Sequence, residues 1–214
     1  MFGVKINKTI RLLMLSDIFL ITGFGLIAPI LSIFIKENLI GGTIFAAGLA
    51  SALFILTRSV IQLPFSKYVD SHDNKVKWLI FGTLLISIVP FIYIFSTNIW
   101  HIYLAQILNG IGAGFAHPTW LGLWSTHLDK KHESFEWSLY STLAGIGTAV
   151  TALIGALIAE FIGFSYTFIF VGLMALVGFF ILFGLEKKRK KLTKVKITHY
   201  HKKRKLVGHI KNIH

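Results

Sequence analysis

Long apolar segments separated by short polar ones dominate the pattern of this 214-residue chain. Six of these segments are about 20 residues long, the length with which a helix crosses roughly 30 Å of hydrocarbon. The pattern therefore predicts an all-α integral membrane protein with six transmembrane helices. The segments lie approximately at residues 12–35, 43–65, 78–95, 100–124, 137–162 and 166–185.

The composition agrees with this interpretation. Hydrophobic residues make up 54% of the chain and charged residues only 14%, with a mean hydropathy of +0.69, whereas about 25% of a soluble domain is charged. The first apolar segment is too long for a signal peptide and has no cleavage site of small residues before the second, so we expect it to remain as a helix. The absence of cysteine excludes disulfides, thiolate metal sites and cysteine nucleophiles.

Lysine and arginine gather on one side of the predicted membrane. They precede the first segment, separate the second from the third and the fourth from the fifth, and follow the sixth, whereas the other side has only Lys36. Since positive loops stay in the cytoplasm, both termini are expected to be cytoplasmic in a multi-pass protein of the cell (plasma or inner) membrane. We therefore divide the chain into a cytoplasmic N-terminus (1–11), a six-helix domain (12–185) and a basic cytoplasmic tail (186–214), which we expect to be disordered alone.

The tail carries twelve Lys or Arg residues and four His residues after Glu186. Contact with anionic lipid headgroups is the favoured interpretation. Nucleic acid is not an expected partner, because Tyr200 is the single aromatic residue there and no nucleic-acid-binding fold is present.

A short pattern occurs twice, 89 positions apart. GFGLIAP at 23–29 and GAGFAHP at 112–118 share two glycines and a proline in register, at mirrored depths of helices that run in opposite directions. This favours a 3+3 inverted repeat, as in many secondary transporters, although Gly and Pro are also common in membrane helices and the match can be chance. Glycine lets helices approach closely and proline bends them. The expected helix-bend and packing residues are Gly23, Gly25, Pro29, Gly110, Gly112, Gly114, Pro118, Gly147 and Gly155.

Four local patterns, in this order, carry a resemblance to a known family. The first segment contains GFGLIAPILSIFI, and RSVIQLPFSKYVDSHDNK follows within and after the second. The fourth contains QILNG, and the fifth a spaced set of small residues. Together they resemble the amino-terminal six helices of the major facilitator superfamily (MFS). The matching residues are Gln62, Pro64, Asp70, Lys75, Gly110, Gly147 and Gly155. In the fifth segment the family's pattern of glycines and a proline is reduced, with Thr151, Ala152 and Ala156 at the other positions.

The resemblance has departures with functional consequences. Gln106 stands where the family pattern has an arginine, which puts a family-style proton-coupling role for that position in doubt. The loop before Lys75 lacks two glycines and two basic residues of the family pattern, which weakens the latch that this loop is thought to form. The family usually has twelve helices in two halves, so the resemblance implies a second copy or a partner half, and a homodimer is the simplest closed assembly.

Five polar residues inside the predicted helices are candidates for a substrate or ion pathway, because polar groups within the membrane usually face a cavity or a partner. Asp17 is a candidate proton or cation site, or else is wetted from the cytoplasm or caps structure. Arg58 either faces the cavity in a substrate or coupling role or forms an internal ion pair or hydrogen-bond anchor, and its depth differs from that of Asp17. Gln106, Asn109 and His117 fall on one helix face with Gly110. His117 either titrates near neutral pH or packs against a neighbour.

Other polar and aromatic residues are expected near the membrane surfaces. Asp70 and Lys75 form a candidate cytoplasmic loop gate, fixed to the helix ends by charge. Glu136 and Glu160 are expected at solvated helix ends. We interpret three tryptophans at helix ends as interface anchors: Trp100, Trp124 and Trp137.

No enzyme motif is found, and no cofactor or metal is expected. Without a nucleotide-binding motif, any pumping would use an ion gradient. The sequence thus supports a half-size MFS-like secondary transporter that moves a small solute by alternating access as a dimer. One form of this hypothesis couples the transport to protons. The alternative is a non-transporting membrane scaffold or regulator derived from an MFS half.

Overall fold

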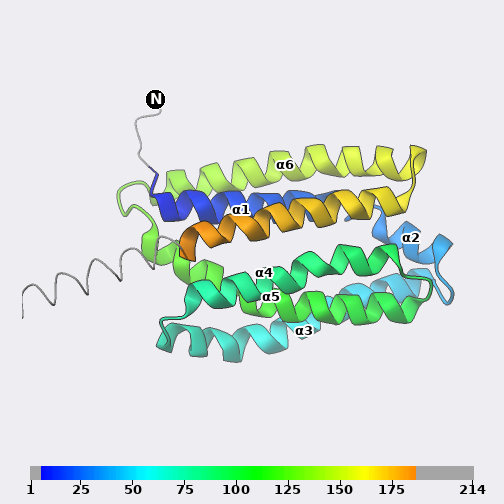
Figure 1. Ribbon diagram of the computed structural model, residues 1–214, viewed down its shortest axis with the longest axis horizontal. Helices are drawn as coiled ribbons and strands as arrows, with labels where there is room; N and C mark the ends of the chain where they lie inside the picture. The colour runs from blue at the N-terminus through cyan, green and yellow to red at the C-terminus, as the bar shows by residue number, and fades with distance from the viewer. Residues whose placement is uncertain (1–5, 187–214) are drawn as a thin grey trace, which may run out of the picture.

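The computed structural model describes residues 6–186, and these form a bundle of long helices (Figure 1). The helices are α1 (Lys8–Gly25), α2 (Leu31–Asn38), α3 (Ile44–Ser71), α4 (Lys75–Ile94), α5 (Ile99–His127) and α6 (Glu133–Phe161). Another helix, Phe164–Glu186, follows and is called the last helix below. The all-α prediction is confirmed for the described residues.

Polar side chains mark the beginnings of three helices, where the first-turn N–H groups have no partner inside the helix. Asn7 accepts from the N–H of Thr9 at the start of α1 (3.0 Å). Thr43 does the same at α3, and Asn98 at α5. Two turns need glycine: Gly41 before α3 (φ +78°) and Gly163 before the last helix (φ +118°) adopt backbone conformations that other residues rarely take.

The prediction of one helix over residues 12–35 is wrong. α1 ends at Gly25, the chain makes tight turns through residues 26–30, and α2 begins at Leu31. Pro29 lies within this break. A proline has no N–H and its ring clashes with the carbonyl group four residues earlier, which here belongs to Gly25.

The inner loop after the second segment is shorter than predicted. α3 continues six residues beyond position 65 and ends at Ser71, so that Asp70 lies in its last turn. The turn before α4 contains only residues 72–74. Most polar residues of this region are therefore helical, because a long helix can extend past the membrane into water.

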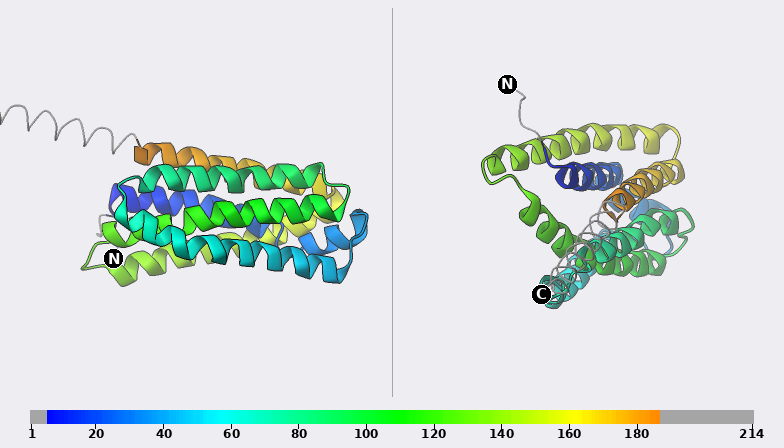
Figure 2. Two further views of the ribbon diagram at one scale, coloured as in Figure 1. Left: turned by 90° about the horizontal axis from the view of Figure 1, so that it is seen from below. Right: turned by 60° about the vertical axis from the view of Figure 1, so that its left-hand side comes forward.

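The helices form two groups. One, the α5 group, consists of α3, α4 and α5, in which α3 and α4 both pack along α5. The other, the α1 group, consists of α1, α6 and the last helix. In it α6 packs along α1, and the last helix is joined to α1 where the hydroxyl of Ser16 donates to the carbonyl of Gly178 (2.8 Å). Figure 1 shows the groups as upper and lower layers, and the right-hand view of Figure 2 shows them meeting at an angle.

The last helix also joins the two groups. The hydroxyl of Ser87 on α4 donates to the carbonyl of Ala175 (3.1 Å), and the ring of Phe91 on α4 lies against Gly172. The beginning of α1 and the end of the last helix lie at the same end of the bundle (Figure 1).

Four described helices are long and apolar enough to cross a membrane: α3, α4, α6 and the last helix. α1 and α5 lie alongside them in the bundle (Figure 2, left). Charged or polar side chains lower the apolar character of these two helices, and their spanning of the membrane stays a prediction. The basic tail falls outside the described residues.

Candidate functional site

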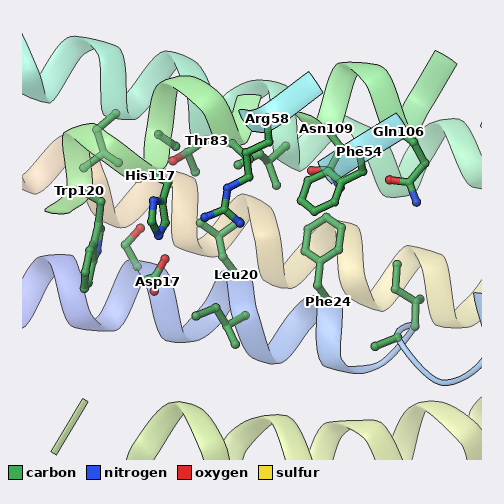
Figure 3. Close-up of a pocket in the computed structure, with 18 of the residues that line it drawn as sticks. Asp17, Leu20, Phe24, Phe54, Arg58, Thr83, Gln106, Asn109, His117 and Trp120 are labelled. Carbon is green, nitrogen blue, oxygen red and sulfur yellow. The ribbon is translucent and has the colours of Figure 1, made fainter. Parts of the chain in front are cut away.

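A cavity of about 530 Å³ lies between the two helix groups. Its walls are mostly apolar and come from the α1–α2 region, α3, α4, α5 and α6. All five predicted pathway residues line it, and Figure 3 shows their side chains: Asp17, Arg58, Gln106, Asn109 and His117. Their roles stay a prediction, but the structure does bring them to one place.

Asp17 lies nine residues after Lys8, at the end of the cavity nearest Trp120 (Figure 3). The hydroxyl of Tyr140 on α6 donates a hydrogen bond to Asp17 Oδ2. Asp17 makes no ion pair within residues 6–186. Its carboxyl group is therefore held by a neutral donor, across the contact between α1 and α6. The sequence reasoning missed Tyr140, although a hydroxyl within an apolar helix needs a partner.

The guanidinium of Arg58 points from α3 into the cavity, with His117 on one side and Phe54 on the other (Figure 3). Its Nε donates to Gln62 Oε1, one helical turn further along α3 (3.2 Å). The head group thus faces the cavity while its Nε is held by a hydrogen bond, so both interpretations left open by the sequence stay in place. An ion pair for Arg58 is absent from the described part of the chain.

Gln106, Asn109 and His117 come from α5, and Gln106 and Asn109 are buried. Among the described residues, Gln106 Oε1 and His117 Nδ1 are buried without a hydrogen-bond partner, as is the hydroxyl of Thr83 on α4. A Cβ at Gly110 would lie 2.7 Å from Thr57 Cβ and 2.8 Å from the carbonyl oxygen of Phe54, so that Gly110 packs against α3.

Four aromatic rings cluster where α5 meets α6: Trp120, Trp124, Trp137 and Tyr140. The rings of Trp120 and Trp124 stack with centroids 4.7 Å apart, and Trp124 is fully buried. The prediction that Trp124 is an interface anchor is therefore wrong, because its ring faces α6. Trp100 and Trp137 are exposed, as such anchors would be.

Glu136 is also fully buried, which corrects the prediction of a solvated helix end. Its Oε2 accepts from the backbone N–H of Asp129 (3.1 Å), so the carboxyl group caps the turn between α5 and α6 from inside. A carboxylate in the first turn of a helix is also favoured by the helix dipole. Glu160 is exposed, as predicted.

A second acid shapes the same turn from outside. Asp129 Oδ2 lies 2.9 Å from His132 Nδ1, and the N–H of Lys131 donates to Asp129 Oδ1 (3.0 Å). The hydrogen bond from His132, followed by that from Lys131, lowers the pKa of the Asp129 carboxyl group.

Asp70 and Lys75 contact each other, as the gate prediction requires. Lys75 Nζ lies 3.4 Å from Asp70 Oδ1, and the same Nζ is close to Gly122 of α5. This pair joins the end of α3, the start of α4 and a turn of α5. Because Asp70 is largely exposed, the ion pair itself stabilises little, and its role as a gate stays a prediction.

The predicted packing glycines lie at helix contacts. A Cβ at Gly23 would lie 3.1 Å from Met174 Cβ of the last helix, and one at Gly25 would lie 2.7 Å from Thr151 Oγ1 of α6. A Cβ at Gly147 of α6 would lie 2.4 Å from Thr22 Cγ2, and one at Gly155 would lie 2.1 Å from the carbonyl oxygen of Leu26.

The corresponding glycines of α5 face the other two helices of their own group. A Cβ at Gly112 would lie 2.8 Å from the carbonyl oxygen of Gly82 on α4, and one at Gly114 would lie 2.8 Å from Ile61 on α3. These glycines let neighbouring helices approach α5 closely from two sides.

Known transporters resemble this chain over most of its length. It is 23% identical over 175 residues to an uncharacterised MFS-type transporter of Methanocaldococcus jannaschii, which covers 81% of this chain and 44% of the relative. It is 25% identical over 187 residues to the quinolone resistance protein NorA of Staphylococcus aureus, which covers 87% of this chain and 47% of NorA. The chain thus spans about half the length of these relatives.

A solved structure has a similar fold. The POT family transporter PepTSo superposes with a TM-score of 0.74 at 16% identity, over 87% of this chain and 38% of that one. The family model of the Major Facilitator Superfamily matches residues 13–212. This match covers most of the chain, and the chain therefore belongs to the major facilitator superfamily of membrane transporters.

Proposed function

We propose that this chain is a six-helix half of a secondary transporter, which moves a small solute across the cell (plasma or inner) membrane by alternating access. One observation carries the proposal. Of the six buried side-chain polar atoms without a partner among residues 6–186, three belong to side chains that line one cavity: Thr83, Gln106 and His117. Such atoms are costly unless water or a solute satisfies them. Family membership favours this function over the scaffold alternative.

In this proposal α1 with α2 crosses the membrane once, and so do α3, α4, α5, α6 and the last helix, with both termini in the cytoplasm. Contacts of the two glycine patterns support a 3+3 inverted repeat. Gly23 lies against the last helix and Gly112 against α4, the sixth and third spans; Gly25 lies against α6 and Gly114 against α3, the fifth and second. Exchanging each span with its equivalent in the other half exchanges these contacts as well.

A second six-helix body would complete the cavity wall, because this chain spans about half the length of its relatives. A second copy of the chain, related by a two-fold axis, is the simplest such body. The alternative is that the second six-helix body is a different polypeptide or a continuation of the same one. Rocking of the two bodies would expose the cavity to each side in turn.

Proton coupling is the proposed role of Asp17. Its carboxyl group bonds to the neutral Tyr140 hydroxyl and makes no ion pair within the described residues. The same carboxyl group can therefore gain and lose a proton. The hydrogen bond from Tyr140 would change with the protonation state of Asp17, at the contact between α1 and α6.

The test is solute flux into proteoliposomes that contain the full chain, with a fluorescent quinolone as the first solute because one relative is a quinolone resistance protein. An imposed pH gradient should accelerate flux in the wild type and in Glu160→Gln, whose side chain is exposed, but not in Asp17→Asn. Equal acceleration in all three would contradict proton coupling at Asp17.

The assembly state provides an independent test. Cross-linking and mass measurement in nanodiscs should find a dimer or a complex with another six-helix body. A chain that remains strictly monomeric and also shows no flux of any solute tested would contradict the proposed transport.

A further inference from the structure

The head group of Arg58 has unused hydrogen-bonding capacity. A guanidinium carries five N–H donors, and Nε alone has a partner within the described residues, Gln62. The remaining donors belong to the two Nη atoms at the tip, which points into the cavity (Figure 3). This forked pair of nitrogens matches the two oxygens of a carboxylate.

The glycines of α5 hold the backbone of Arg58 in place. A Cβ at Gly110 would lie 3.1 Å from the backbone nitrogen of Arg58, and one at Gly114 would lie 3.5 Å from its carbonyl oxygen. α3 therefore lies directly on α5 at this residue. With the backbone fixed by this contact and Nε by Gln62, less side-chain freedom is lost when a ligand binds.

The surroundings of the guanidinium favour an anion with an apolar body. Phe54 precedes Arg58 by one helical turn, and Phe24 of α1 faces Phe54 across the cavity (Figure 3). Asp17 lies on the side of Arg58 away from Phe54, opposite His117, and is bonded to Tyr140. A cation in such an apolar place requires a counter-ion, and the two phenylalanine rings on the cavity wall offer an apolar surface for a flat group.

A second unsatisfied group lies further along the cavity. Gln106 is only 6% exposed, and its Oε1 has no partner among residues 6–186. Figure 3 shows it beyond Phe54 and Asn109, on the side of the cavity away from Asp17. A carbonyl oxygen needs an N–H or O–H donor.

We propose that the cavity binds a small organic carboxylate whose carboxylate group pairs with the Nη atoms of Arg58. Its apolar ring system lies between Phe24 and Phe54, and a hydroxyl or amide N–H on the far end donates to Gln106 Oε1. This assignment rests on the proposed function, since it names the class of solute for the same cavity.

Equilibrium dialysis tests the head group with the full chain in nanodiscs. The probes are a hydroxynaphthoate, its methyl ester and the aminomethylnaphthol with the same ring pattern. The acid should bind about tenfold more tightly than the ester or the amine. Equal affinities, a preference for the amine, or no binding of any probe would overturn the proposal, and none of these outcomes depends on a variant.

Variants locate the site. Arg58→Gln should abolish the preference for the acid, Arg58→Lys should keep part of it, and Lys67→Gln, an exposed cation on the same helix, should leave it unchanged. Gln106→Leu should weaken the hydroxynaphthoate severalfold but leave plain naphthoate unaffected. An acid preference that survives in Arg58→Gln would overturn the assignment.

Flux measured separately distinguishes the two proposals. If proteoliposomes transport a solute but binding shows no head-group preference, the carboxylate site is wrong and transport stands. If the acid binds through Arg58 but no solute crosses, the site stands and transport is wrong.

Discussion

The two glycine–proline segments share one spacing but have different structures. Residues 23–29 end α1 and form turns, and Pro29 is exposed. Residues 112–118 lie within the continuous helix α5, and Pro118 is buried. The same spacing of two glycines and a proline thus accompanies a break in one helix and a continuous helix in the other. A proline removes one hydrogen bond in either place, so the neighbours of each segment decide the outcome.

Two differences account for this. α5 lies between α3 and α4, whose backbones contact it at Gly110 and Gly112. The residue after Pro118 is Thr119, whose hydroxyl donates to the carbonyl of Phe115 (2.7 Å), whereas Ile30 follows Pro29 and has no such group. This bond adds to the helical turn around Pro118, whose missing N–H leaves the neighbouring carbonyl of Gly114 without its usual donor. The break in α1 is instead stabilised from outside, where α6 contacts Leu26.

The largest expected effect tests that external contact. In Gly155→Ala the added Cβ would lie 2.1 Å from the carbonyl oxygen of Leu26, so α6 must move away from the break. We expect a loss of about 3 kcal/mol in the free energy of unfolding, measured by denaturant unfolding in mild detergent. Gly145→Ala on the same helix, where nothing lies within 4 Å, is the control and should have little effect. Equal stability of both variants would show that α6 does not support the break.

The next prediction compares the two copies directly. A Cβ at Gly112 would meet the backbone oxygen of Gly82 at 2.8 Å, whereas one at Gly23 would meet the side chain of Met174 at 3.1 Å. Because a side chain moves more easily than a backbone, Gly112→Ala should destabilise by about 2 kcal/mol and Gly23→Ala by about half of that. The same unfolding assay applies, with Gly48→Ala on α3 as the control. The reverse order would contradict the tighter packing of α5.

A smaller effect is expected for the hydroxyl that follows Pro118. Thr119→Val keeps the shape of the buried side chain but loses the hydrogen bond to Phe115, and should cost about 1 kcal/mol. Thr119→Ser keeps the hydroxyl and should therefore retain most of the stability of the wild type. If valine and serine are equally stable at this position, the hydroxyl does not compensate for the proline.

The smallest effect lies at the turn where α5 ends. His132 donates to Asp129 and lowers the pKa of its carboxyl group. The stabilisation is therefore present above the ordinary carboxyl pKa and is lost as the pH falls through the lowered value. In His132→Ala the Asp129 titration, followed by carbon NMR of the labelled carboxyl group, should move to higher pH. An unchanged titration would contradict the contribution of His132.

Part of this fold and of the candidate site can be predicted from the sequence alone. The apolar segments predicted the helices because their length matches the membrane thickness. Asp17, Arg58 and His117 were recognisable as cavity candidates because such groups are rare within apolar helices. The structure brings them together with Gln106 and Asn109.

Other features depend on contacts between distant parts of the chain. Glu136 looks like an ordinary acid near a helix start, and only the fold of the preceding turn against it explains its burial. Trp124 is buried because α6 crosses it, and Tyr140 matters because Asp17, 123 residues earlier, lies beside it. Hydrophobic periodicity describes each helix separately and contains no information about such pairs.

The polar cavity has a consequence for how the protein is made. α1 and α5 provide Asp17, Gln106, Asn109 and His117, and neither is among the four helices that are apolar enough to be recognised as spans one by one. Membrane insertion selects segments by their apolar content. We infer that α1 depends on later-synthesised neighbours, α6 and the last helix, before it is stably seated. The polar residues that α1 and α5 place in the cavity are thus also the ones that lower the apolar content of these two helices.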